Sequence, residues 1–291
     1  MAADGWARAV RQQLGLGRIL PLGGPADGSW ITEKAASQVL MDAASEWPGI
    51  RPEAVRVSLA DPDSAPEPAV VGPVSALPPG PLRIEAEFSA SALLPLPEAA
   101  EQLRRVLFEA AEARLGLVTT EVDLRVTGLI DEPEPGREPS AATSRGSGAV
   151  AGEPAPASDQ APAPGPRLAP GPVPVREPTV ELGEAAAAVP GVARLAATLG
   201  FAVSRIRAGQ GHPVEIKDDD DPPRRRVQVQ LAVTAGQRAL DVARNVRAVV
   251  AAAAAGDAPG PVTVAVLVTA VEPRPSADAG AARPARALDE W

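Results

Sequence analysis

The sequence predicts an α+β protein built from two small αββαβ modules, each a roughly three-stranded sheet with two helices on one face. Two kinds of segment follow one another in the same order twice. In one kind, apolar residues recur at helical spacing; in the other, apolar and polar residues alternate strictly, as in a strand. A long stretch rich in proline and alanine separates the two series. We therefore divide the chain into an N-terminal segment (1–29), a first module (30–130), a disordered linker (131–178), a second, divergent module (179–272) and a disordered tail (273–291).

The composition limits the classes of function. The chain has 291 residues, of which 45% are hydrophobic but only 2% aromatic, so the cores must be built from Ala, Val, Leu and Ile. A net charge of −9 argues against a general nucleic-acid binder, which needs clustered basic residues to displace counterions from phosphates. Because cysteine is absent, disulfides, thiolate catalysis and cysteine-ligated zinc are excluded.

The N-terminal segment contains a candidate amphipathic helix within residues 5–17, where Trp6, Val10 and Leu14 recur at a spacing of four. It has two interpretations: a contact with a membrane or partner, or a terminal helix that packs Trp6 on the first module. No apolar stretch is long enough to span a membrane and no signal-peptide core is present. We therefore expect a cytoplasmic protein without a membrane span.

The first half of the first module reads as helix, strand, loop and strand. Thr32 is a candidate N-cap for a helix that continues to Trp47 and stops at Pro48-Gly49. Residues 54–60 alternate as a strand, and a proline-rich loop at 61–81 follows. The next strand, at 82–88, alternates apolar and charged residues.

A second helix and a third strand complete the first module. Pro97 suits the first turn of a helix, and Gly116 suits its C-terminal end. The closing strand, at 122–126, again alternates. With the helices on one face of the sheet, the opposite face is expected to be exposed and charged, and its residues are a candidate interaction surface: Arg83, Glu85, Glu87, Asp123 and Arg125.

The linker at 131–178 is dominated by Pro, Ala, Glu, Gly and Ser, with almost no large apolar residue. Such a segment cannot bury enough surface to offset the entropy of ordering. We expect it to be a semi-stiff spacer; a ligand for a proline-recognising domain is the less favoured reading.

The second module repeats the order with weaker signals. Its expected elements are a helix at 180–189, a strand at 201–206, a polar loop containing Asp218–Asp221 and Arg224–Arg226, a strand at 227–233, a helix at 240–250 and a strand at 262–268. Its outer sheet face is expected to be nearly neutral, and its residues complete the candidate interaction surface: Gln228, Gln230, Thr263, Ala265 and Leu267. Because this face lacks charge, we expect a partner to cover it.

No catalytic, cofactor-binding or metal-binding residues are predicted. His212 is the only histidine and lies in a glycine-rich loop without a recognisable nucleophile beside it. The acidic run at 218–221 lacks the alternating ligands and shaping glycine of a calcium loop, so we interpret it as a charged hairpin loop that the flanking Arg224–Arg226 partly neutralise. The glycines at 15–24 follow no predicted strand, and no phosphate-binding loop motif is present.

The order of motifs resembles the alkaline shock protein family. The resemblance rests on a helix ending in Pro-Gly-Ile at 48–50 or Pro-Gly-Val at 190–192, a long helix ending in Arg-Leu-Gly-Leu at 114–117, and the strand Val-Asp-Leu-Arg-Val-Thr-Gly-Leu at 122–129. The segments at 17–25 and 77–88 are also similar to a group of actinobacterial proteins that carry the label "nucleopolyhedrovirus P-ten family". The resemblance implies a response to cell-envelope stress, association with the envelope through a small membrane-anchored partner, and no enzymatic activity.

Our leading hypothesis is therefore a non-enzymatic, stress-associated scaffold or adaptor that binds other proteins. The expected partners are related small α/β stress proteins or a membrane-anchored protein at the inner face of the membrane, with self-association open. The alternative is a nucleic-acid-binding regulator that uses Arg224–Arg226. A hydrolase that uses His212 is a third hypothesis.

Overall fold

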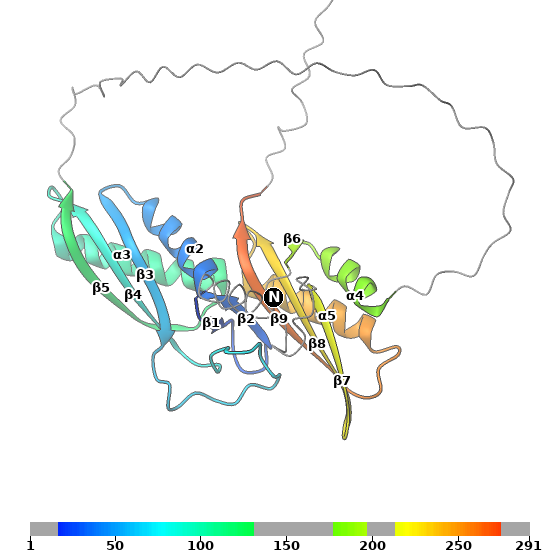
Figure 1. Ribbon diagram of the computed structural model, residues 1–291. Helices are drawn as coiled ribbons and strands as arrows, with labels where there is room; N and C mark the ends of the chain where they lie inside the picture. The colour runs from blue at the N-terminus through cyan, green and yellow to red at the C-terminus, as the bar shows by residue number, and fades with distance from the viewer. Residues whose placement is uncertain (1–16, 131–176, 197–212, 275–291) are drawn as a thin grey trace, which may run out of the picture.

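The computed structural model describes residues 17–130, 177–196 and 213–274 (Figure 1). These residues form a mixed α+β structure with two sheets, which confirms the predicted class. The expected N-terminal helix, most of the linker, the expected strand at 201–206, His212 and most of the tail lie outside the described residues.

The first sheet has the order β3-β4-β5. β3 (Ile50–Leu59) and β4 (Leu82–Ser91) are antiparallel, and β5 (Thr119–Ile130) runs parallel to β4. β4 and β5 contain the segments predicted from sequence and extend beyond them, whereas β3 begins four residues before the predicted segment at 54–60 and ends one residue before its end. The helical connection between β4 and β5 is what allows this parallel pairing.

Two helical segments cover one face of the first sheet. α2 (Glu33–Ser45) begins at the predicted cap, where the Thr32 hydroxyl accepts a hydrogen bond from the Ala35 N–H at 3.3 Å. α3 (Leu96–Glu109) continues directly into η1 (Ala110–Leu115), a final segment with the wider π-helical hydrogen bonding. Gly116 ends η1 with a left-handed φ of 86°, as its position in the sequence predicts.

The second sheet contains strands from both ends of the chain. Its path is β1-β2-β9-β8-β6, and β7 also pairs with β8. Its strands are β1 (Ile19–Pro21), β2 (Ser29–Thr32), β6 (Val192–Leu195), β7 (Val214–Asp220), β8 (Pro223–Thr234) and β9 (Val262–Glu272). α4 (Pro178–Ala187) and α5 (Ala239–Ala254) belong to this half of the chain.

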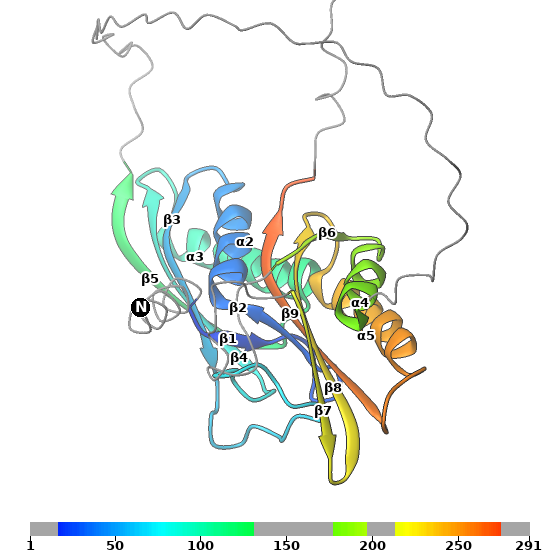
Figure 2. The same ribbon diagram turned by 45° about the vertical axis from the view of Figure 1, so that its right-hand side comes forward.

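The β1–β2 hairpin connects the two halves of the molecule. The sequence analysis assigned no strand before residue 32 and placed a module boundary at Trp30. In the structure Trp30 lies inside β2, which pairs in parallel with β9 through Trp30 opposite Leu267. Figures 1 and 2 both show this hairpin lying between the first sheet and the rest of the second sheet. The predicted segment 1–29 therefore contributes directly to the sheet of the second half.

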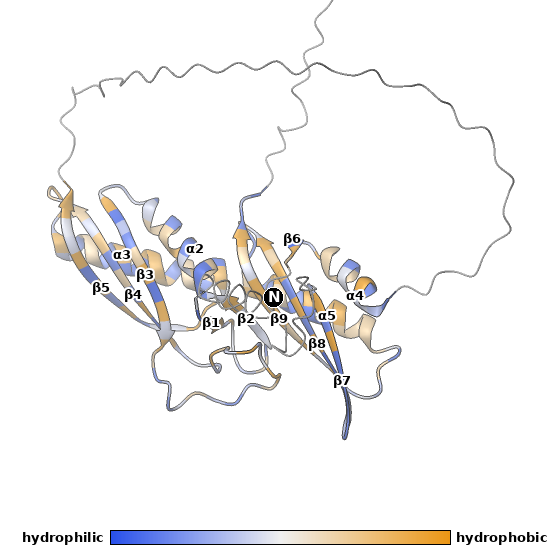
Figure 3. Ribbon diagram, in the orientation of Figure 1, coloured by the Kyte–Doolittle hydropathy of each residue, from blue (hydrophilic) through white to orange (hydrophobic). Residues whose placement is uncertain are grey.

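Residues 218–226, expected as a charged hairpin loop, do lie in a β-hairpin, but most of them belong to its strands rather than to a loop. Asp218–Asp220 are the end of β7 and pair with β8, with Asp218 opposite Arg225 and Asp219 opposite Arg224. Acidic residues are unfavourable in strands, which is why the sequence predicted a loop. The facing arginines compensate for this. Figure 3 shows that the far end of β7 is hydrophilic, whereas the central part of the sheet is hydrophobic.

One hydrophobic core runs through both halves. It joins Leu20 and Ile31 of the hairpin to Leu40 of α2, Leu107 of α3 and Leu240 of α5. A second, small cluster lies on the other face of the second sheet. The two halves are thus packed against each other rather than separated.

Candidate interaction surface

The charged residues predicted on the first module do lie together on the outer face of the first sheet. Strand pairing places Glu85 of β4 opposite Asp123 of β5, and Glu87 opposite Arg125. The side chains alternate with the fully buried Ile84 and the nearly buried Ala86, which point toward the helices. We call this face, with Arg83, Glu85, Glu87, Asp123 and Arg125, the charged face.

Ion pairs cross the charged face from strand to strand. The Arg83 Nε donates to Glu121 at 2.6 Å and lies 3.4 Å from an Asp123 oxygen, while Arg125 approaches Glu87 at 3.5 Å. The hydrogen bond and charge of Glu121 raise the pKa of Arg83. All these side chains are more than a third exposed, so solvent screens each pair and its contribution to stability is small. Their importance lies in the pattern that they present to a partner.

A polar cluster that the sequence analysis missed borders the charged face. Glu53 lies at a bulge in β3 and accepts hydrogen bonds from the hydroxyls of Ser89 and of Thr127, the latter at 2.9 Å. These bonds lower the pKa of Glu53. The residues come from three strands, so no local sequence pattern predicted their meeting.

The outer edge of the first sheet is open. Among the strands that the structure describes, β5 pairs with β4 alone. Large apolar side chains stand along it: Val118, Val126 and Leu129 are 46%, 40% and 60% exposed. An edge strand with free backbone groups and exposed apolar residues is a ready site for another strand.

The second half does not present the exposed face that the sequence predicted. Gln228, Gln230 and Leu267 are buried and Thr263 is half-buried. Part of the cover comes from the chain itself, since Leu267 and Ala265 pack with residues of the β1–β2 hairpin and of the long loop between β3 and β4: Ile19, Trp30, Val70 and Ala76. The expectation of a free face was wrong because the sequence gives no sign that the hairpin extends this sheet or that the distant loop packs on its face.

The arginines proposed for nucleic-acid binding are paired with carboxylates. Arg225 is 8% exposed and bonds both Asp218, at 2.8 Å, and Asp257. Arg224 and Arg226 both bond Asp219. These contacts raise the pKa of Arg225 and lower the pKa values of Asp218 and Asp219. Residues 215–226 carry five acidic and four basic side chains, so the hairpin offers no positive excess to a phosphate backbone.

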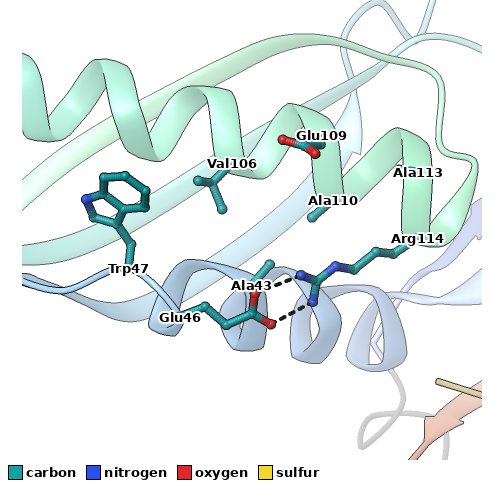
Figure 4. A pocket seen from close by; sticks show the side chains of 8 residues that line it. All are labelled: Ala43, Glu46, Trp47, Val106, Glu109, Ala110, Ala113 and Arg114. Carbon is teal, nitrogen blue, oxygen red and sulfur yellow. Dashed lines mark hydrogen bonds and ion pairs between the residues drawn. The ribbon is translucent and has the colours of Figure 1, made fainter. Parts of the chain in front are cut away.

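A groove on the helical side of the first half is a second candidate site. It has a volume of about 320 Å³ and lies between the end of α2 and the α3–η1 segment. Figure 4 shows Trp47 at one end, Val106 and Ala110 along the wall, and the Glu46–Arg114 pair at the other end. That pair is bidentate, with distances of 3.0 and 2.9 Å, and it lowers the pKa of Glu46. The volume is near the lower limit for a small-molecule site and suits a single side chain of a partner.

The sequence analysis did not identify this groove. Trp47 was read only as the end of a helix, and Arg114 as part of a terminal motif. The 42% exposure of Trp47 makes it a candidate contact residue, and only the structure shows this exposure.

Comparison with known proteins gives no relative: no family model, no curated protein and no solved structure matches the chain. None of the helices within residues 17–130, 177–196 and 213–274 is long and apolar enough to cross a membrane. In the same residues, no group of three or more His, Cys, Asp or Glu side chains is arranged to hold a metal ion.

Proposed function

We propose that the protein is a non-enzymatic scaffold or adaptor that binds other proteins through the charged face and the adjoining open edge of β5. The observation that carries this proposal is the open edge itself, which combines exposed Val126 and Leu129 with a regular row of charges on the same strand. Edge strands of this kind bind partners through backbone hydrogen bonds and gain specificity from alternate side chains.

We interpret the two halves as related α/β modules with different tasks, although among the described residues the second has three strands (β6, β7 and β8) between its helices where the first has two. The first copy leaves its outer sheet face free. In the second, the long loop of the first half packs on the corresponding face, next to Ile19 and Trp30 of the adjoining β1–β2 hairpin. One copy thus serves binding, and the other serves the internal stability of the pair.

The resemblance to the alkaline shock protein family supports a role in cell-envelope homeostasis. We propose that the partners are related small α/β stress proteins or a membrane-anchored protein, met at the cytoplasmic face of the membrane. No residue is assigned a catalytic role.

Affinity capture of the full chain from cells under envelope stress tests the proposal. We expect wild-type protein to recover a small α/β protein or a membrane-anchored protein, and the Val126→Asp/Leu129→Asp variant to lose it. Val249→Asp is the matched control, because Val249 is 41% exposed on α5, away from the edge. Identical recovery by wild type and by the edge variant would overturn the proposed site.

The alternative of a nucleic-acid-binding regulator has less support, because each arginine of the 224–226 run is already paired. It predicts binding to DNA or RNA that weakens steeply with salt and is lost when the three arginines are replaced. We expect no measurable binding at low salt, and salt-sensitive binding that requires these arginines would favour the alternative.

A further inference from the structure

The open edge of β5 carries a self-complementary pattern. Around Leu124, an acidic residue lies one position before it and a basic residue one position after it, namely Asp123 and Arg125. Both side chains are exposed, at 64% and 78%, and their contacts within the chain are long, at 3.4 and 3.5 Å. These charges are therefore available to a partner.

The directions of the backbone groups can be followed along β5. At its two ends, the carbonyls of Val118 and Ile130 accept hydrogen bonds from the N–H groups of Leu82 (2.7 Å) and Ala92 (3.3 Å), so both face β4. Between these ends the pairing with β4 shifts by one residue at two bulges. Each bulge inserts one residue into β5 and so reverses which residues direct their backbone groups toward β4.

Between the two bulges, every second residue of β5 accordingly directs its backbone N–H and C=O groups away from β4, toward the open edge. The carbonyl of Val122 accepts a hydrogen bond from the Nε of Arg104 at 3.4 Å, a side chain, rather than from a strand. Backbone groups of alternate residues point the same way along a strand. The N–H and C=O of Val122, Leu124 and Val126 therefore face the open edge, where no strand of the described residues pairs with them. The Val122 carbonyl keeps a second lone pair for a further strand beside the one that Arg104 occupies.

We infer that two copies of the chain pair through β5, antiparallel and centred on Leu124. In this register Leu124 lies opposite its own counterpart and exchanges both backbone hydrogen bonds with it. Val122 and Val126 of the two copies form the neighbouring bonded pairs. Asp123 then lies opposite Arg125 of the second copy, in the closely spaced positions where side chains interact most strongly.

The pairing joins two three-stranded sheets into one continuous sheet. It places the exposed Val126 beside Val122 of the second copy and the half-buried Leu124 beside its counterpart, on the face that carries the helices. Symmetry gives two Asp123–Arg125 contacts for each dimer. The contact is small, so we expect a dissociation constant on the order of micromolar.

Charge reversal at the two positions tests this register in the full chain. Arg125→Asp places two aspartates opposite each other, and Asp123→Arg places two arginines opposite each other. We expect each single variant to weaken dimerisation by at least about tenfold, because like charges face each other twice. The double variant Asp123→Arg/Arg125→Asp restores opposite charges, and an equimolar mixture of the two single variants should form a mixed dimer.

Sedimentation equilibrium from about 1 to 200 µM measures these outcomes, with circular dichroism to confirm that each variant is folded. Arg56→Asp is the matched control: Arg56 is exposed on β3, the opposite edge of the same sheet. We expect it to dimerise like wild type. A wild-type chain that stays monomeric, single variants that dimerise like wild type, or a double variant that stays as weak as the single variants would each overturn the inference.

This inference rests on the proposed function, because it names one partner of the same edge. The two can fail separately. If the wild-type chain is monomeric but Val126→Asp/Leu129→Asp still abolishes capture of the partner, self-pairing is rejected and the proposed scaffold function stands. If the wild-type chain dimerises but these substitutions leave the captured proteins unchanged, the proposed binding of other proteins at this edge is rejected and self-pairing stands.

Discussion

At the scale of single residues, Thr32 makes two contacts that join the halves of the chain. Its hydroxyl oxygen caps α2 by accepting from the Ala35 N–H, and its hydroxyl donates to the carbonyl of Thr269 in β9 at 3.1 Å. The sequence predicted the cap, because Thr precedes a helical pattern. It could not predict the second bond, since the two residues are separated by 237 positions.

Replacing Thr32 with Val should therefore lower the free energy of unfolding by about 1–3 kcal/mol, from loss of the cap and of a buried hydrogen bond. Thr32→Ser keeps the hydroxyl and is the matched control, with most of the stability retained. Urea denaturation of the full chain measures both. Equal losses for Val and Ser would show that packing of the methyl group, rather than the hydroxyl, is responsible.

Asp27 predicts a dependence of stability on pH. Burial alone would raise the pKa of its carboxyl, but hydrogen bonds from Arg244 (2.7 Å) and the Gly24 N–H (2.7 Å), with the charge of Arg247 nearby, lower it overall. A pKa lowered by folding adds stability above the ordinary pKa of Asp, and that stability is lost as the pH falls through the folded value.

We expect Asp27→Asn to cost about 1–3 kcal/mol near pH 7, because charged hydrogen bonds are lost. The difference in the free energy of unfolding between Asp27→Asn and wild type should shrink as the pH falls below about 4. Thermal or urea unfolding between pH 7 and pH 2 measures this difference, and the exposed Asp63→Asn should show little of it. A difference that does not change with pH would contradict the assigned charge.

At the scale of elements, the end of η1 packs closely on α5. Gly116 has a left-handed φ of 86°, and a Cβ placed on it would lie 2.5 Å from the Cβ of Leu240. The sequence predicted the glycine as a helix stop. The contact with α5 could not be predicted, because it depends on how the two halves dock.

Gly116→Ala should therefore lower the free energy of unfolding by at least about 1–2 kcal/mol, from the strain of a left-handed alanine, with the clash against Leu240 adding to it. The matched control is Gly256→Ala, where a Cβ would meet nothing within 4 Å. Differential scanning calorimetry of both variants checks this. Equal melting temperatures for the two would contradict a close contact at Gly116.

The elements themselves were largely readable from the sequence. Apolar/polar alternation in the sequence predicted β4 and the centre of β8, and helical spacing of apolar residues predicted α2, α3 and α5. The failures were β1, β2, β6 and β7, which are either very short or rich in acidic residues. Such strands are stabilised by their neighbours in the sheet rather than by their own residue preferences.

At the scale of the whole molecule, ion pairs and backbone contacts hold the two halves together. Arg244 bonds Asp27, the Arg247 guanidinium donates to the carbonyl of Ala26 at 2.9 Å, and Arg238 donates to that of Glu112 at 3.0 Å. The shared core lies beneath them. The sequence predicted two α/β halves, whereas the addition of the β1–β2 hairpin to the sheet of the second half left no local pattern.

Cutting the chain between the halves should therefore not separate them. We expect a protease site inserted between residues 140 and 165 to give two fragments that elute together on gel filtration at about 10 µM and separate only in denaturant. The uncut protein with the same insertion is the control. Fragments that elute apart under native conditions would contradict the shared sheet.

The pairing of β2 with β9 also has a consequence for biosynthesis. The ribosome makes β2 about 237 residues before its partner in β9. At roughly 5–20 residues per second, the nascent hairpin waits about 10–50 s for that partner. During this interval β1 can pair with one edge of β2, but the edge that later pairs with β9 has no partner in its own chain. Neighbouring nascent chains on one messenger present the same unpaired edge. The timing of translation and the chaperones that meet the emerging chain should therefore determine the yield of correctly assembled protein.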